Sequence, residues 1–308
     1  MISFFFILLG FVLLYFGAEW LVKGASSLAL KAGISPLIVG LTVVAFGTSA
    51  PELVVSTLSS LRGAGDLALG NVIGSNIFNI AVILGIASII APMKIHQQVL
   101  KIDLPVMIVA TGLLMVFLSD FRISRVEGVF LTAGIVAYLL WSSYLARKGK
   151  QDVELPENGN LKYHLDIILS VGGIILLVLG SHFLVSGAVT LARMWGISEA
   201  IIGLTIVATG TSLPELATSI VAGIKKEADI AIGNIIGSNI FNILAILGIS
   251  SIIAPIQSKG ITTYDLLFTV ISVLILTLFL FGKKLLRRWH GMVLLCLYGI
   301  YIVVIWPR

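Results

Sequence analysis

Charged residues are scarce in this chain, and their scarcity excludes an ordinary soluble domain. Asp, Glu, Lys and Arg make up 11% of the 308 residues, whereas hydrophobic residues make up 58%. A soluble domain carries about 25% charged residues. Cysteine is also nearly absent, and the single Cys296 excludes an intrachain disulfide. The composition predicts a polytopic membrane protein, whose net charge of +5 reflects membrane orientation rather than binding to nucleic acid.

The signatures of common enzymes are missing as well. The sequence contains neither HExxH nor GxSxG, and its four histidines fall in loops or near the ends of apolar runs. An enzyme within the membrane would need a nucleophile with its base, or a metal centre. We therefore predict that the protein is not an enzyme and holds no cofactor.

Long apolar runs, by contrast, fill most of the chain. About 20 apolar residues cross a bilayer, and the runs predict an all-α fold of ten transmembrane helices. The predicted spans lie near 2–22, 37–61, 67–91, 102–119, 126–145, 164–187, 200–223, 230–254, 264–282 and 289–306. They form a first five-helix repeat (1–145), a polar linker (146–163) and a second five-helix repeat (164–308).

The loop charges predict how these spans are oriented. Of the 20 Lys and Arg residues, fourteen fall on one side of the predicted membrane and six on the other. Positive loop charge marks the cytoplasmic side. We expect a multi-pass protein of the cell membrane, with both termini outside and the linker in the cytoplasm.

Two sequence blocks occur twice, always 163 residues apart. GLTVVAFGTSAPEL begins at Gly40 and GLTIVATGTSLPEL at Gly203; GNVIGSNIFNI begins at Gly70 and GNIIGSNIFNI at Gly233. An odd number of spans per copy makes the second copy enter the membrane from the opposite side, so the repeats are inverted, as in many secondary transporters.

Each copy of the first block places a glutamate, Glu52 or Glu215, inside apolar sequence. Ionisable residues in lipid are costly and mark a functional site. A proline one position earlier removes a helical N–H donor, so we expect a broken helix near the midplane of the membrane. Hydroxyls and freed carbonyls then lie beside the carboxylates, and such hard oxygen ligands suit Ca²⁺ or Na⁺. The hydroxyls are those of Thr48, Ser49, Thr211 and Ser212.

The second block adds a polar stripe with a spacing of four to each copy. The stripes are Asn71, Ser75 and Asn79, and Asn234, Ser238 and Asn242. Four helices that face one another would form an oxygen cage whose two glutamates give a formal charge of −2. One divalent cation neutralises this charge, and several monovalent cations or protons could do so in turn. The glycines of this block also match a helix-packing motif.

Other residues receive simpler interpretations. Glu19 precedes Lys23 by four residues and is read as an i,i+4 pair; His182, its repeat equivalent, is read as interfacial. Five acidic residues are placed at span ends, where charge is tolerated: Asp103, Asp120, Glu127, Asp229 and Asp265. The pairs Gly17/Gly24 and Gly180/Gly187 give two spans a smooth strip, for close packing or for sliding during transport.

On the two GTSxPE and two GNxxGSN motifs, the chain resembles the sodium/calcium exchanger branch of the calcium/cation antiporter superfamily, in its minimal prokaryotic form. The resemblance implies export of Ca²⁺ driven by entry of Na⁺, by alternating access at one occluded cluster. Glu52 and Glu215 would be the main Ca²⁺ carboxylates, and the four Thr and Ser residues of the first block would be further ligands. Na⁺ would be ligated by the carbonyls of Ala45 and Ala208, and side-chain ligands would come from Ser75 and Ser238.

The amides Asn79 and Asn242 depart from relatives that have aspartate there, which argues against K⁺ dependence. Gly74 and Gly237 stand where proton/calcium exchangers carry glutamate, which disfavours H⁺ coupling. An H⁺/Ca²⁺ exchanger on the same scaffold stays open as an alternative, as does a cation channel. A channel usually obtains its symmetry from several subunits, whereas this chain repeats internally. We expect a functional monomer in the lipid bilayer, with Ca²⁺ and Na⁺ as substrates.

Overall fold

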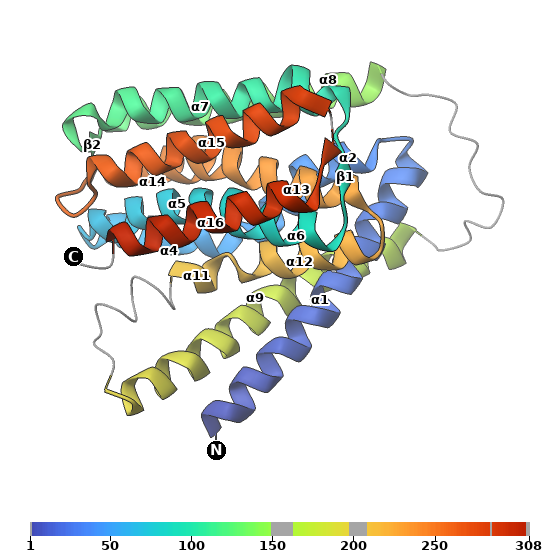
Figure 1. Cartoon of the computed structure of the whole chain (residues 1–308), viewed down its shortest axis with the longest axis horizontal. Coiled ribbons are helices and arrows are strands. Elements are labelled where there is room, and N and C mark those ends of the chain that lie inside the picture. Colours follow the sequence, from blue (N-terminus) through green and yellow to red (C-terminus); the bar gives the residue numbers. More distant parts are fainter. Residues whose placement is uncertain (1, 149–162, 197–207, 284, 306–308) are drawn as a thin grey trace.

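The computed structural model describes residues 2–148, 163–196, 208–283 and 285–305. This part of the chain is helical apart from two pairs of very short strands (Figure 1). Most helices run side by side in one bundle, whereas α1 and α9 form a pair set obliquely to it. The predicted all-helical membrane fold is confirmed.

The first half of the chain contains five helical spans, several of them divided. Its elements are α1 (Ile2–Ala32), α2 (Pro36–Val39), η1 (Gly40–Val44), α3 (Ala45–Thr48), α4 (Ala50–Leu61), α5 (Gly65–Phe78), η2 (Asn79–Ile83), α6 (Leu84–Ile90), β1 (Met93–Lys94), η3 (Val99–Asp103), α7 (Leu104–Phe117), η4 (Leu118–Asp120), β2 (Arg122–Ile123) and α8 (Arg125–Lys148). Segments η1, η2 and η3 are π-helical turns and η4 is a 3₁₀ turn.

The second half repeats this order where it is described. Its elements are α9 (Tyr163–Met194), α11 (Ala208–Thr211), α12 (Leu213–Ile224), α13 (Ala228–Phe241), η6 (Asn242–Leu247), α14 (Gly248–Ile253), β3 (Ile256–Gln257), α15 (Thr263–Lys283), β4 (Leu285–Leu286) and α16 (Arg288–Ile305).

Eight helical segments of the described chain are long and apolar enough to cross a membrane, and the bent pair Pro36–Thr48 and Ala50–Leu61 makes a ninth. The remaining predicted span, 200–223, corresponds to α11 and the shorter apolar helix α12. Its first residues, 200–207, lie outside the described part.

The first span is longer than predicted. The sequence suggested an end near residue 22, but α1 continues to Ala32, because its last turns are rich in good helix formers such as Ala25, Leu28 and Ala29. The helix ends at Gly33, whose φ of +64° suits a glycine after a helix C-terminus. Ile34 N then donates to Ala29 O at 2.9 Å.

The centre of the bundle is formed by α5–α6 and α13–α14. Within these spans 78% and 89% of the apolar window is buried, against 28% for α8 and α9. Both central spans contain the glycine-rich second block. The packing role of that block is seen in the second copy, where a Cβ at Gly237 would lie 2.7 Å from Leu41 O of η1.

Contacts between the halves occur in reciprocal pairs. Strand β1 pairs antiparallel with β4, and β2 pairs antiparallel with β3; moving by 163 residues exchanges the two pairs. In the same way Asp66 accepts from Lys259 N at 2.7 Å, and Asp229, the equivalent of Asp66, lies 3.2 Å from Nε2 of His96, the equivalent of Lys259. Each half therefore contacts the other through equivalent residues.

The α1–α9 pair is antiparallel and packed backbone to backbone. A Cβ at Gly17 would lie 2.8 Å from Leu177 N, and one at Gly180 would lie 2.8 Å from Leu14 N. The close-packing reading of these glycines is therefore confirmed.

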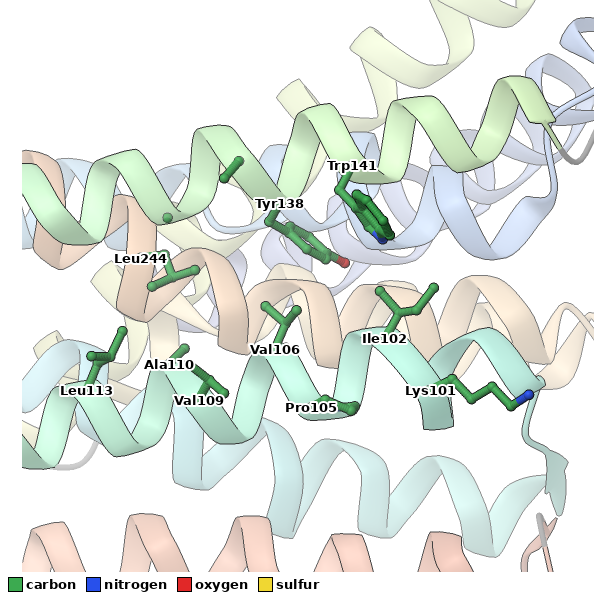
Figure 2. A pocket seen from close by; sticks show the side chains of 12 residues that line it. Lys101, Ile102, Pro105, Val106, Val109, Ala110, Leu113, Tyr138, Trp141 and Leu244 are labelled. Atoms are coloured by element: carbon green, nitrogen blue, oxygen red, sulfur yellow. The ribbon is translucent and has the colours of Figure 1, made fainter.

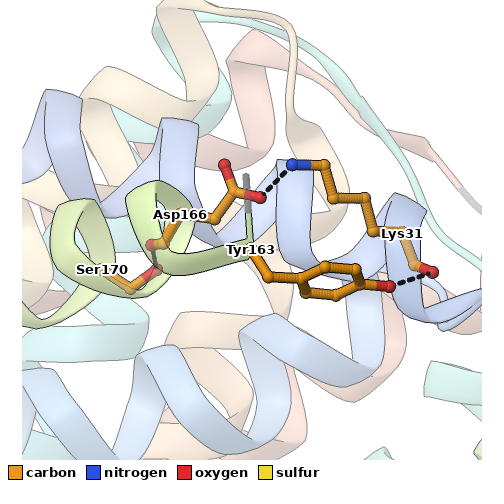
Figure 3. A network of polar contacts seen from close by, with 4 residues as sticks. All are labelled: Lys31, Tyr163, Asp166 and Ser170. Atoms are coloured by element: carbon orange, nitrogen blue, oxygen red, sulfur yellow. Dashed lines mark hydrogen bonds and ion pairs between the residues drawn. The ribbon is translucent and has the colours of Figure 1, made fainter. Parts of the chain in front are cut away.

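One end of this helix pair is tied by an ion pair, Lys31 Nζ to Asp166 Oδ2 at 2.6 Å (Figure 3). Tyr163 adds a hydrogen bond from its hydroxyl to Lys31 O at 3.0 Å. These contacts and the glycine strip make the two helices one packed unit.

Two predictions about isolated acidic residues are wrong. Glu19 does not pair with Lys23; its Oε1 lies 3.1 Å from Lys225 Nζ, because α1 packs along α12. Asp103 is not a tolerated charge at a span end but is fully buried, and it accepts from Tyr138 Oη at 3.1 Å. Tertiary packing buries Asp103, although its place at the end of a predicted span suggests a position near the membrane surface.

Candidate functional site

Both copies of the first block break their helix at the serine before the proline. Ser49 has φ −83° and ψ 8°, and Ser212 has φ −88° and ψ 7°, so both leave the α-helical region in the same way. Across Ser49 the helix axis bends by 46°. The predicted break is confirmed, and its cause is the missing N–H of the proline that follows two residues later.

The carbonyl freed by the second proline finds a partner on another helix. Gly210 O lies four residues before Pro214 and accepts a hydrogen bond from the Ser181 hydroxyl of α9. The position equivalent to Ser181 in α1 is Ala18, which has no hydroxyl. The second broken helix is thus held by a hydroxyl of α9 that α1 lacks at the equivalent position.

The two glutamates are joined to each other's half by reciprocal hydrogen bonds. Ser49 Oγ donates to Glu215 Oε1 at 2.8 Å, and Ser212 Oγ donates to Glu52 Oε1 at 3.0 Å. Glu52 and Glu215 are 0% and 1% exposed. Both carboxylates therefore belong to one buried cluster formed by both halves.

The threonines and the asparagines of the stripes form a second reciprocal pair. Thr48 Oγ1 donates to Asn234 Oδ1, and Thr211 Oγ1 donates to Asn71 Oδ1, both at 3.0 Å. The amide nitrogen of Asn71 donates to Glu52 O at 3.2 Å, and that of Asn234 to Glu215 O at 3.3 Å. Each asparagine thereby positions the broken helix of its own half and binds the other.

The cluster has unbalanced negative charge. No ion pair in the described chain joins Glu52 or Glu215 to a basic side chain, and Oε2 of each glutamate lacks a hydrogen-bond partner among the described residues. Burying a carboxylate without a partner is costly. A cation or a proton would remove this cost, and the surrounding hydroxyl and carbonyl oxygens are of the type that Ca²⁺ and Na⁺ prefer.

The serines of the second block reach the same cluster. Ser75 Oγ lies 2.9 Å from Ser212 Oγ, and Ser238 Oγ lies 3.5 Å from Glu215 Oε1. The structure thus brings together all the side chains predicted from the first block with these two serines.

Asn79 and Asn242 each begin a π-helical turn, η2 and η6, and such turns are frequent at functional sites. Asn242 Nδ2 donates to Asn76 Oδ1 at 3.0 Å, whereas neither side-chain atom of Asn79 has a partner in the described chain. Both amides are buried.

The carbonyl ligands Ala45 and Ala208 stay predictions. Ala45 O already accepts from Ser49 N at 3.0 Å. Ala208 begins α11 at the equivalent position.

Sequence reasoning missed Asn76, Ser56 and Ser219. Asn76 accepts from Asn242, and the two serines accept from Asn71 and Asn234 at 2.9 Å and 3.0 Å. The sequence could have indicated Ser56 and Ser219, because each stands four residues after a glutamate and the two are 163 residues apart.

The fold and this cluster define a class: a polytopic helical membrane protein with a buried, anionic site of hard oxygen ligands. A search of family models assigns residues 2–144 and 165–306 to one family, described as sodium/calcium exchanger protein. The chain belongs to this family, whose members are cation antiporters and not enzymes.

Individual relatives agree with this assignment. The chain is 40% identical over 303 residues to the putative antiporter CaxA of Alkalimonas amylolytica, covering 94% of each chain. It is 32% identical to the sodium/calcium exchanger MaX1 of Methanosarcina acetivorans, covering 99% of this chain and 98% of the relative. The solved structure of the sodium-calcium exchanger NCX_Mj soaked with 2.5 mM Na⁺ and 0.1 mM Ca²⁺ superposes with a TM-score of 0.88, at 32% identity and 99% coverage of both chains.

Proposed function

We propose that the protein is a secondary antiporter that exchanges Na⁺ for Ca²⁺ across the cell membrane, with both ions competing for the buried oxygen cluster. The observation that supports this most directly is the pair of reciprocal bonds, Ser49 to Glu215 and Ser212 to Glu52. They place two buried carboxylates in one site, and each carboxylate keeps an oxygen without a hydrogen-bond partner in the described chain.

Competition follows from charge. With Asn79 and Asn242 neutral, the two glutamates give the cluster a formal charge of −2. One Ca²⁺ neutralises it, and so do two monovalent cations, so occupancy by one species excludes the other. The relatives named sodium/calcium exchangers make Na⁺ the expected monovalent partner. The ligands are Glu52 and Glu215 with the neighbouring Thr and Ser oxygens, the carbonyls of Ala45 and Ala208, and the side chains of Ser75, Ser238, Asn79 and Asn242.

The topology we propose has ten spans in two inverted repeats, 1–145 and 164–308, joined by a cytoplasmic linker (146–163), with both termini outside. The reciprocal strand pairs and the antiparallel α1–α9 pair support it. Because each half contributes equally to the cluster, exchanging the conformations of the halves would open the site to the other side of the membrane. The α1–α9 unit slides over the bundle in this exchange, and one chain suffices for transport.

The test is ⁴⁵Ca²⁺ uptake into proteoliposomes. An outward Na⁺ gradient should drive uptake, and Glu52→Gln and Glu215→Gln should each abolish it, because a neutral amide halves the charge that Ca²⁺ requires. Asp120→Asn is the matched control, since it removes an exposed carboxylate that accepts a local hydrogen bond from Arg122 N at 3.0 Å.

Each alternative predicts a different result. Uptake that follows a pH gradient and ignores Na⁺ would show an H⁺/Ca²⁺ exchanger. Uptake that needs neither gradient would show a channel. Full Na⁺-driven uptake by either glutamine variant would overturn the proposed site.

A further inference from the structure

A cavity of about 570 Å³ opens between α7 and α8 (Figure 2). Its walls are apolar side chains of these two helices, and Leu244 of η6 lies at its back. The residues that line this groove include Lys101, Ile102, Gly134, Ala137, Tyr138 and Trp141.

On α8 the groove is lined by small residues. Gly134 and Ala137 line it, and the equivalent positions of α16, 163 residues later, are Leu297 and Ile300. In the second half Phe268 of α15 packs on Tyr301 of α16, with ring centroids 5.2 Å apart. Phe268 is the equivalent of Pro105, so the second half has an aromatic ring where the groove of the first half has a proline.

One end of the groove is polar. Lys101 lies at that end, and the indole nitrogen of Trp141 is on the side of the ring nearest to it (Figure 2). The hydroxyl of Tyr138 is engaged by Asp103 at 3.1 Å, so this side chain offers the groove its ring rather than a free donor. The arrangement is an apolar channel that ends at one cation, next to an interfacial aromatic residue.

We propose that this groove binds an anionic phospholipid, with one acyl chain along Gly134, Ala137 and Leu244 and the phosphate at Lys101. Both walls are membrane spans, so a lipid chain is the apolar molecule with access to them. A lysine at the polar end complements the phosphate, and anionic head groups gather near basic residues at the membrane surface. The proposal depends only on the membrane fold and not on which ion is transported.

The test uses Gly134→Leu, which introduces the residue found at the equivalent position of α16, Leu297. A Cβ at Gly134 would lie 3.5 Å from Leu244 Cδ2, an ordinary contact, so the longer side chain enters the groove without a backbone collision. The probe is phosphatidylglycerol retained by the detergent-purified protein, measured by native mass spectrometry. Displacing about two methylenes should weaken retention about tenfold.

Gly299→Leu is the matched control, because in the described chain nothing lies within 4 Å of a Cβ at this exposed glycine of α16. It should retain the lipid. Lys101→Gln should retain a lipid but lose the preference for phosphatidylglycerol over phosphatidylcholine. Ala137→Ile, a second way to fill the groove, should act like Gly134→Leu. Equal retention by the wild type and both filled variants would overturn the site, and an unchanged preference in Lys101→Gln would overturn the head-group contact.

Discussion

The ion pair between Glu19 and Lys225 should favour one conformation of the transporter over the other. It connects α1, part of the sliding unit, to Lys225 at the C-terminal end of α12. The repeat equivalents of these residues are His182 on α9 and Arg62 at the end of α4. If transport exchanges the conformations of the halves, His182 comes to face Arg62, and these two side chains do not attract each other.

The size of the expected shift follows from how exposed the two side chains of the ion pair are. The two side chains are 33% and 35% exposed, and ion pairs at such sites contribute about 0.2–1 kcal/mol. Loss of the pair should therefore shift the equilibrium between the two conformations about 1.4- to 5-fold. Glu19→Gln should produce this shift, and His182→Glu should shift the equilibrium in the same direction by creating a pair with Arg62 in the other conformation.

Spin-label distances give the populations. After Cys296→Ser, one label on α1 and one on α12 are measured by double electron–electron resonance in Na⁺-free and Na⁺-containing buffer. Lys23→Gln is the control, because it removes a charge from the same helix without touching the bridge. Populations that stay the same in both Glu19→Gln and His182→Glu, or a shift toward the present conformation in His182→Glu, would refute the reasoning.

Two further predictions concern the packing of the sliding unit and the charge of the cluster. Gly17→Leu should lower stability by about 1–3 kcal/mol, as overpacking does, because a Cβ at Gly17 would lie 2.8 Å from Leu177 N of α9. It should slow Na⁺-driven Ca²⁺ uptake without weakening equilibrium Ca²⁺ binding, because α1 and α9 must stay packed to move as one unit; uptake at the wild-type rate would count against such a unit. Asn242→Asp should make Ca²⁺ uptake depend on an additional monovalent cation or proton, because it raises the formal charge of the cluster from −2 to −3 and removes the 3.0 Å bond to Asn76; uptake with the wild-type response to K⁺ and pH would contradict the charge argument.

The sequence predicted those parts of the site that depend on local chemistry. Pro51 and Pro214 each remove an N–H, which breaks the helix wherever the chain folds, and the breaks occur at Ser49 and Ser212. Carboxylates and hydroxyls one turn apart share a helix face, but each serine donates to the glutamate of the other half and not to that of its own.

Contacts between the halves could not be predicted in the same way. A repeat offset gives equivalence but not proximity, so nothing in the sequence indicates that Thr211 meets Asn71 rather than its own Asn234. Glu19 and Asp103 were misread for the related reason that only tertiary packing brings Lys225 to one and covers the other.

The two halves differ more around the cluster than within it, and this distribution has a physical reason. The bonds of the first block's side chains are nearly symmetric: the Thr–Asn bonds are both 3.0 Å, and the Ser–Glu bonds are 2.8 Å and 3.0 Å. The surroundings of the cluster are not, since Ser181 corresponds to Ala18, Glu19 to His182 and Gly134 to Leu297. An alternating site must offer the same ligands to the ion in both conformations, whereas the energies of those conformations are set by contacts outside it. Asymmetry around a symmetric site therefore allows the chain to favour one conformation without changing how the ion is held.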